Sequence, residues 1–264
     1  MIPNATIAIP QTLIAALQLA KHVVVFTGSG VSAESGIATF RDALTGLWER
    51  FNVKDLATPE AFRRDEALVW GWYEWRRMKV LRAQPNPAHI AIAALAQHVP
   101  KLTVITQNVD DLHERAGSAG VLHLHGSLHR PHCSVCGQAR SLPRGTPKEP
   151  QGVRRVSPPR CMNCGGSVRP GVVWFGEDLP GEVISHAIAT ARDCDVLIAI
   201  GTSGLVEPAA RLPHLAMQAD AKVVQVNPSS TPLDDACTWS LRGAAGSVIP
   251  TLLQTAFPSA SQGG

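Results

Sequence analysis

Four cysteines stand in two C-x-x-C pairs, Cys133/Cys136 and Cys161/Cys164, with residues 137–160 between the pairs. Each pair forms a short knuckle on which two thiolates can bind one ion. Four thiolates complete the tetrahedral shell of Zn²⁺ and leave no position open for substrate. Paired C-x-x-C units of this kind favour metal over disulfides in a chain that stays in a reducing compartment. The spacing therefore predicts one structural zinc ion.

A glycine-rich stretch, GSGVSAESGIATFR, runs from Gly28 to Arg41 directly after an apolar run. Gly28 and Gly30 fit the first two glycines of the dinucleotide-binding fingerprint, but Ala33 holds the third position. Backbone amides at such a turn can bind a pyrophosphate. A tight turn with no ligand explains the pattern about as well when it is taken alone.

Two further stretches carry polar side chains next to apolar runs. In TQNVDDLH, Gln107, Asn108 and Asp110 can hydrogen-bond a ribose or a carboxamide, although helix capping is an equal alternative. In HLHG, His125 can act as a general base near neutral pH, whereas a hydrogen-bonded structural histidine is the plainer interpretation.

These residues lie beside segments with clear secondary-structure signals. The predicted strands, mostly β-branched and apolar, are residues 23–27, 101–108, 120–126, 195–203 and 221–229. The predicted helices are residues 11–21, 60–83, 89–98 and 247–256. Alternating strands and helices predict an α/β fold with a parallel sheet, helices on both faces and ligands bound beyond the carboxyl ends of the strands.

Composition narrows the class of protein. The chain has 264 residues, of which 45% are hydrophobic and 17% charged, as in ordinary globular proteins. No apolar run approaches the ~20 residues of a membrane helix, and the first residues lack a signal or transit pattern, so we expect a cytoplasmic protein without a membrane partner. The net charge of +3 hides a basic segment at 130–170, whose one acid is Glu149.

Taken in order along the chain, these motifs resemble the sirtuins, the NAD-dependent protein lysine deacylases. The match extends through RPGVVWFGE, GTS, VNPS and GAAGSVIP. The resemblance implies a Rossmann-like domain formed by residues 1–42, 89–130 and 170–256. It also implies a small lobe of a helical module (43–88) and a zinc ribbon (131–169). NAD and an acyl-lysine peptide would meet in the cleft between them, and residues 257–264 would form a disordered tail.

The resemblance also assigns roles. The catalytic residues would be His125, as the base that takes a proton from the ribose hydroxyls, with Asn108 and Asp110 positioning the ribose or nicotinamide and a water. NAD, consumed as co-substrate, would contact Gly28, Ser29, Gly30, Ser32, Glu34, Phe40, Arg41, Trp48, Gln107, Asn108, Val109, Asp110, Gly201, Thr202, Ser203, Asn227, Pro228, Ser229 and Ala245. The segment Val172–Glu177, with Val173, Phe175, Gly176 and Glu177 as contact residues, would pair with the substrate as an added strand.

One pair of residues bears on the acyl group. Tyr73 and Arg76 stand three residues apart, so a helix places them on one face, where a phenol and a guanidinium can bind a carboxylate together. They resemble the signature of the sirtuin subgroup that removes succinyl and malonyl groups, and Ala43 matches a small residue that widens that subgroup's acyl pocket. The alternative is that Tyr73 belongs to an apolar cluster with Trp70, Trp72 and Trp75 while Arg76 faces solvent.

Two other functions compete with deacylation. An NAD site of this kind also serves ADP-ribosyl transfer to protein. A zinc ribbon with a basic segment could bind nucleic acid, but residues 130–170 offer no aromatic side chain for base stacking, and this function leaves the TQNVDD and HLHG motifs unexplained. We therefore expect no nucleic-acid partner.

Overall fold

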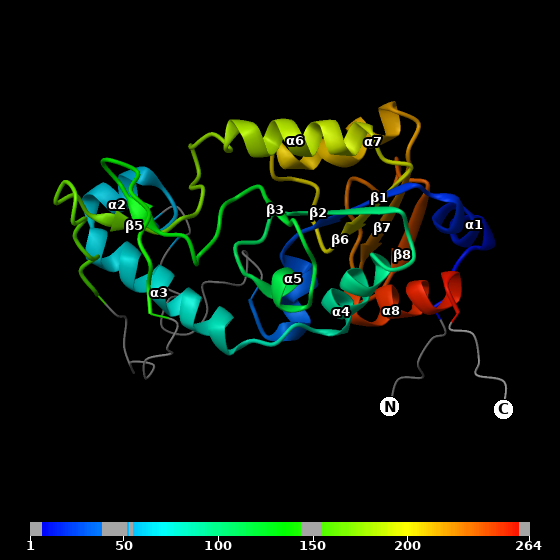
Figure 1. Ribbon diagram of the computed structural model, residues 1–264, viewed down its shortest axis with the longest axis horizontal. Coiled ribbons are helices and arrows are strands. Elements are labelled where there is room, and N and C mark those ends of the chain that lie inside the picture. The colour runs from blue at the N-terminus through cyan, green and yellow to red at the C-terminus, as the bar shows by residue number, and fades with distance from the viewer. Residues whose placement is uncertain (1–6, 39–51, 53–54, 144–154, 259–264) are drawn as a thin grey trace.

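A six-stranded parallel sheet forms the centre of the molecule (Figure 1). The computed structural model of the chain describes residues 7–38, 52, 55–143 and 155–258. The strands are β1 (His22–Thr27), β2 (Lys101–Thr106), β3 (Leu122–His123), β6 (Val196–Ile200), β7 (Lys222–Asn227) and β8 (Trp239–Arg242). Their spatial order is β3-β2-β1-β6-β7-β8, with every neighbouring pair parallel. This is the doubly wound Rossmann order. Successive strands are added to one side of β1 up to β3, and from β6 onward to its other side.

Helices cover both faces of the sheet (Figure 1). One face, which includes Val23 and Val25 of β1, packs on α1 (Gln11–Leu19), α4 (Pro87–Leu95) and α8 (Ala245–Ala256). The opposite face, with Val24 and Phe26, packs on α6 (Gly181–Arg192) and α7 (Leu212–Gln218). Because all six residues of β1 are buried, the strand reads as a continuous apolar run rather than an alternating one.

A third hydrophobic cluster lies at one end of the sheet, at the left of Figure 1. It is built on α2 (Pro59–Arg64) and α3 (Glu66–Arg82), whose buried Phe62, Trp72 and Tyr73 pack with Trp174. Nearby, β4 (His132–Cys133) and β5 (Val168–Arg169) form a two-stranded antiparallel sheet. The remaining described elements are the 3₁₀ helices η1 (Ser29–Ser35) and η4 (Ala209–Arg211) and the short helix α5 (Leu112–Arg115).

Several expected elements differ from the structure in extent. The helix expected over 60–83 is two helices, because Asp65 leaves the helical conformation and its side chain caps α3 by accepting from the Leu68 amide. The strand expected over 120–126 shrinks to two residues, so His125 lies in the loop that follows β3. Phe257, assigned to the tail, stacks on His98 with ring centroids 4.8 Å apart. Among the described residues, every helix is too short or too polar to span a bilayer.

Candidate active site

The glycine-rich turn lies at the point where the sheet order reverses. The Gly28 amide donates to the Ile200 carbonyl and the Gly30 amide to the Gly201 carbonyl, both at 2.9 Å. A Cβ added at Gly30 would come within 2.7 Å of the Gly201 Cα, so neither loop has room for a side chain there. Gly201 also has a φ of +59°, which glycine adopts without strain. The two loops therefore pack backbone to backbone at the edge where doubly wound sheets bind nucleotides.

Ser32 of η1 joins the two polar side chains that follow β2. Its hydroxyl donates to the Asp110 carboxylate at 3.0 Å and accepts from the Asn108 side-chain amide at 3.1 Å. Burial raises the pKa of Asp110, while hydrogen bonds from the Leu112 amide and from Ser32 oppose that shift. The three side chains are buried and form one fixed polar group below the loops.

Two histidines lie beneath this group. His89 contacts Ser32, the His113 Nε2 lies 3.0 Å from the Thr27 hydroxyl, and the two imidazole rings lie edge to face at 4.9 Å. Burial lowers the pKa of His89 to about 4 and that of His113 to about 3. Both are therefore neutral near pH 7, and pKa values this low make them weak bases.

His125 and His123 are distinguished by their hydrogen bonds. The His125 Nδ1 lies 2.9 Å from the Gln107 carbonyl, which can only accept, so Nδ1 carries the proton and Nε2 keeps its lone pair. Burial lowers the pKa of His125, and the Gln107 carbonyl opposes that shift. His123 instead contacts Glu114 at 2.6 Å and the Asn108 carbonyl at 3.1 Å. Burial lowers its pKa too, but Glu114, the Asn108 carbonyl and Asp110 together outweigh burial, and the net shift is upward. Of these two histidines, His125 is the one arranged to accept a proton.

Side chains connect the loops that follow β2, β6 and β7. The Gln107 amide donates to the Thr202 hydroxyl at 2.8 Å, and the Asn227 amide donates to the Thr202 carbonyl at 2.9 Å. Glu34 of η1 accepts from the Gly246 amide in the first turn of α8, beside Ala245. Four loops that are distant in the sequence thus meet at one edge of the sheet. The predicted residues that lie on or beside them are Gly28, Ser29, Gly30, Ser32, Glu34, Gln107, Asn108, Val109, Asp110, Gly201, Thr202, Ser203, Asn227, Pro228, Ser229 and Ala245.

Tyr73 and Arg76 lie on the same face of α3. The Arg76 guanidinium carbon is 5.0 Å from the centroid of the Trp72 ring and 5.8 Å from that of Tyr73. Burial lowers the pKa of Arg76, and the nearby Tyr73 and Asp110 raise it. Arg76 is half-buried and packs against the aromatic rings of its own helix. Tyr73 does pack in the aromatic cluster, edge to face with Trp72 at 4.6 Å, so part of the plainer alternative holds for this residue.

The segment Val172–Glu177 already pairs with the chain itself on one side. The Val173 amide donates to the His125 carbonyl at 2.9 Å, and the Phe175 amide donates to the Ala57 carbonyl at 3.0 Å. Glu177 binds Arg169 and accepts from the Trp174 amide at 2.8 Å. A peptide added as a strand must therefore use the other polar groups of the segment, including those at Gly176. Phe175 is 48% exposed.

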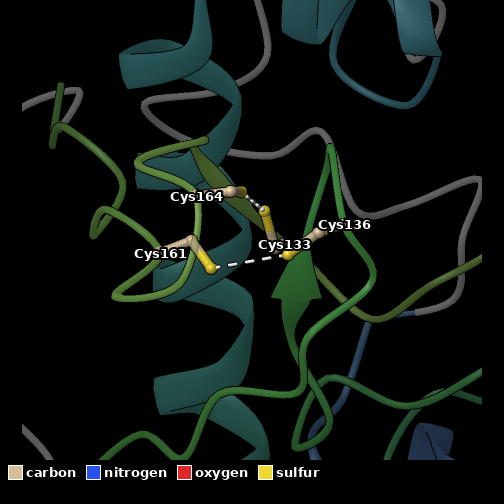
Figure 2. Close-up of side chains that lie close together, drawn as sticks. All are labelled: Cys133, Cys136, Cys161 and Cys164. Atoms are coloured by element: carbon tan, nitrogen blue, oxygen red, sulfur yellow. Dashed lines mark hydrogen bonds between the residues drawn. The ribbon is translucent and has the colours of Figure 1, made fainter.

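The four paired cysteines come together as the spacing predicts (Figure 2). Their sulfur atoms lie within 4.8 Å of one another, with Cys133–Cys164 at 3.4 Å and Cys136–Cys161 at 3.6 Å. A tetrahedral Zn²⁺ site with bonds of about 2.3 Å separates its sulfurs by about 3.8 Å. The cluster therefore fits a zinc ion, which these four residues would hold. With four protein ligands the ion has no open position and its role is structural.

Comparison with known proteins identifies this arrangement. The family model described as "Sir2 family" matches residues 28–208. The chain belongs to the Sir2 family. A Sir2 relative named NAD-dependent protein deacylase, from Methylococcus capsulatus, is 63% identical over 92% of this chain and 95% of its own length. An NAD-dependent protein deacylase 1 from Pseudomonas aeruginosa is 58% identical over 90% of this chain and 96% of its own.

Solved Sir2 structures share the fold. A Sir2 homolog–NAD complex superposes with a TM-score of 0.86 at 45% identity and covers 94% of both chains. A Sir2–p53 peptide–NAD⁺ complex gives a TM-score of 0.77 at 27% identity, over 93% of this chain and 97% of that one. The sheet order, the four-cysteine cluster and these neighbours confirm the expected Rossmann-like fold with an added zinc-binding unit.

The residues predicted for the site and the residues that the structure places there do not fully coincide. Phe40, Arg41, Ala43 and Trp48, expected to contact NAD or the acyl group, lie outside the described residues. Conversely, the site contains Trp174 and the buried His89 and His113, which the motifs did not single out. The one available signal for His89 is the sequence NPAH, in which Asn86 and His89 form a capping box at the start of α4.

Proposed function

We propose that this Sir2 protein is an NAD-dependent protein lysine deacylase that favours acyl groups ending in a carboxylate. The reaction class rests on the family and on the relatives named NAD-dependent protein deacylase. The observation that carries the acyl preference is the placement of Tyr73 and Arg76 on one face of α3, with the Arg76 guanidinium carbon 5.8 Å from the centroid of the Tyr73 ring. A succinyl or malonyl group presents the carboxylate that a phenol and a guanidinium bind together.

His125 has the geometry of the base. Its Nε2 lone pair can take a proton from a ribose hydroxyl of NAD, and the Gln107 carbonyl steadies the imidazolium that results. Asn108 and Asp110, held by Ser32, would orient the ribose or nicotinamide. Nicotinamide, the free lysine and O-acyl-ADP-ribose are the expected products.

Substrate binding follows from the same geometry. We propose that NAD and the acyl-lysine protein meet between a sheet domain (residues 1–42, 89–130 and 170–256) and a small lobe (43–88 and 131–169). The solved Sir2–p53 peptide–NAD⁺ complex supports a peptide as the second substrate. The cytoplasm, which the paired cysteines favour, is the proposed compartment.

The experiment is to replace Arg76 by Met, which keeps the length of the side chain and removes its charge. Because hydrogen bonds to charged groups contribute about 1.5–3 kcal/mol, desuccinylation should fall roughly 10- to 100-fold in kcat/KM. Deacetylation should change far less. Equal desuccinylation by Arg76→Met and native protein would contradict the acyl preference. Radiolabelled NAD separates the other candidate reaction, since label fixed to protein would indicate ADP-ribosyl transfer instead of deacylation.

A further inference from the structure

Trp174 lies between Tyr73 and the two-stranded sheet that carries Cys133. Its indole Nε1 donates a hydrogen bond of 3.1 Å to the Tyr73 hydroxyl, and both side chains are buried. Tyr73 and Trp174 are far apart in the sequence, so this bond fixes the phenol from outside its own helix. A phenol oxygen that accepts one hydrogen bond can still donate its proton, here to a carboxylate.

Arg169 of β5 holds Trp174 in place. Its guanidinium carbon lies 3.6 Å from the centroid of the Trp174 ring. The same guanidinium binds both oxygens of Glu177, at 2.5 and 2.8 Å, and donates to the Val172 carbonyl at 3.1 Å. Glu177 in turn accepts from the Trp174 amide. Arg169 is half-buried; it stacks on the Trp174 ring and, through Glu177, is linked to the Trp174 amide. Lysine does not reproduce this stacked and bidentate arrangement.

The contacts extend to the cysteine cluster. Arg169 follows Val168, which pairs in register with Cys133 across β4 and β5. At the other end, burial raises the pKa of Tyr73 to about 12, opposed by the neighbouring Arg76, Trp174 and Arg169. The phenol is therefore protonated, and a donor, throughout the range in which enzymes of this kind are assayed.

We propose that Trp174 and Arg169 are positioning residues for the acidic acyl group, acting through the Tyr73 hydroxyl. This inference rests on the proposed function, because it presupposes that Tyr73 contacts the acyl carboxylate. Trp174 aims the hydroxyl, and Arg169 sets the plane of the indole from β5. The four-cysteine cluster then contributes to acyl selectivity through β5, although it lies outside the reacting groups.

The test compares succinyl- and acetyl-lysine peptides of one sequence, with kcat and KM measured separately. Trp174→Phe keeps an aromatic ring but removes the indole donor together with part of the ring volume. It should lower the ratio of desuccinylation to deacetylation in kcat/KM by about 2- to 10-fold, the range for one neutral hydrogen bond, mainly through a higher KM for the succinyl peptide. In a Tyr73→Phe background the same replacement should change the ratio no further. Arg169→Lys, which keeps the charge, should lower the ratio in the same direction.

Arg160→Gln serves as the matched control. Arg160 belongs to the same region and contacts Ser167 and Glu66 rather than Trp174, so its loss should leave the ratio unchanged. Calorimetric affinity for the succinyl peptide gives a second readout that does not depend on turnover. If Tyr73→Phe lowers the ratio while Trp174→Phe and Arg169→Lys do not, the positioning role is wrong and the proposed function stands. If Tyr73→Phe itself leaves the ratio unchanged, both the acyl preference and the positioning role are wrong.

Discussion

The His125 imidazole is bound through Nδ1 to the backbone carbonyl of Gln107, at 2.9 Å. This bond comes from the residue that directly follows β2, so the sheet itself sets the tautomer of the ring. The neighbouring His123 has both nitrogens engaged, one of them by Glu114. Two histidines two residues apart thus have opposite pKa shifts and different roles.

The pH dependence of the reaction should follow His125. Burial lowers its pKa, and only the neutral ring can take a proton, so kcat/KM should rise as pH rises through a midpoint below the ordinary histidine value of about 6.5. Above that midpoint His125 is fully neutral, and its titration gives no further increase in kcat/KM. The profile is measured at saturating NAD with an acyl peptide that does not titrate in this range. A rise centred clearly above pH 7 would contradict the assignment.

The stability of the fold should depend on the two neutral buried histidines. The pKa of His89 is about 4 in the folded chain and about 6.5 in the unfolded chain, so the unfolded state binds the extra proton between these values. The stability that this pKa difference of His89 contributes to the fold is complete above pH 6.5. It is lost as pH falls toward 4, at about 1.4 kcal/mol per pH unit.

The non-titrating variant His89→Gln isolates this effect. Its free energy of unfolding in urea should fall less than that of the native protein between pH 6.5 and 4.5, although the variant is less stable at pH 7. Parallel curves for the two proteins would show that His89 is protonated in the fold and that its low pKa is wrong.

Packing between the two glycine loops should make Gly30 intolerant of a side chain. In Gly30→Ala the new Cβ would meet the Gly201 Cα at 2.7 Å, and forced overpacking of this kind costs about 1–3 kcal/mol. We expect a lower thermal midpoint and a raised KM for NAD. Gly181→Ala is the control, because a Cβ there meets no atom within 4 Å. Native KM and stability in Gly30→Ala would refute the close packing.

The four-cysteine cluster should hold one zinc ion that maintains its part of the fold. Cys161→Ser removes one thiolate, so the purified protein should lose its zinc, measured by mass spectrometry of the metal, and unfold at a lower temperature. Cys237→Ser is the control, because Cys237 lies outside the cluster. Full zinc content in Cys161→Ser would exclude this ligand set.

The strongest signals in the sequence were local ones. Each C-x-x-C pair is one knuckle, and β1 is an uninterrupted apolar run, so both could be predicted without tertiary contacts. The strand Trp239–Arg242 was missed because its short alternating pattern carries little apolar signal. The sequence predicts one helix over 60–83, because aspartate occurs both inside helices and at their first residue. Only the structure shows that the Asp65 side chain caps α3.

Contacts between distant residues account for the features of the site that local sequence patterns do not predict. The Trp174–Tyr73 hydrogen bond joins residues that are 101 positions apart, and neither neighbourhood reveals it. The Ser32–Asp110 hydrogen bond depends on β1 and β2 being adjacent, a relationship that periodicity alone does not define. The family resemblance points to the segments that contain these residues, but it does not predict the two hydrogen bonds.

The most direct test of the account is a mass-spectrometric panel of acetyl-, malonyl-, succinyl- and glutaryl-lysine peptides. Each is incubated with the native protein and with His125→Ala, in the presence and absence of NAD. We predict NAD-dependent removal with O-acyl-ADP-ribose as co-product, a preference for the acidic acyl groups, and a loss of about 10²- to 10⁴-fold in His125→Ala. Deacylation without NAD, undiminished activity in His125→Ala, or no removal of any acidic acyl group would contradict the account.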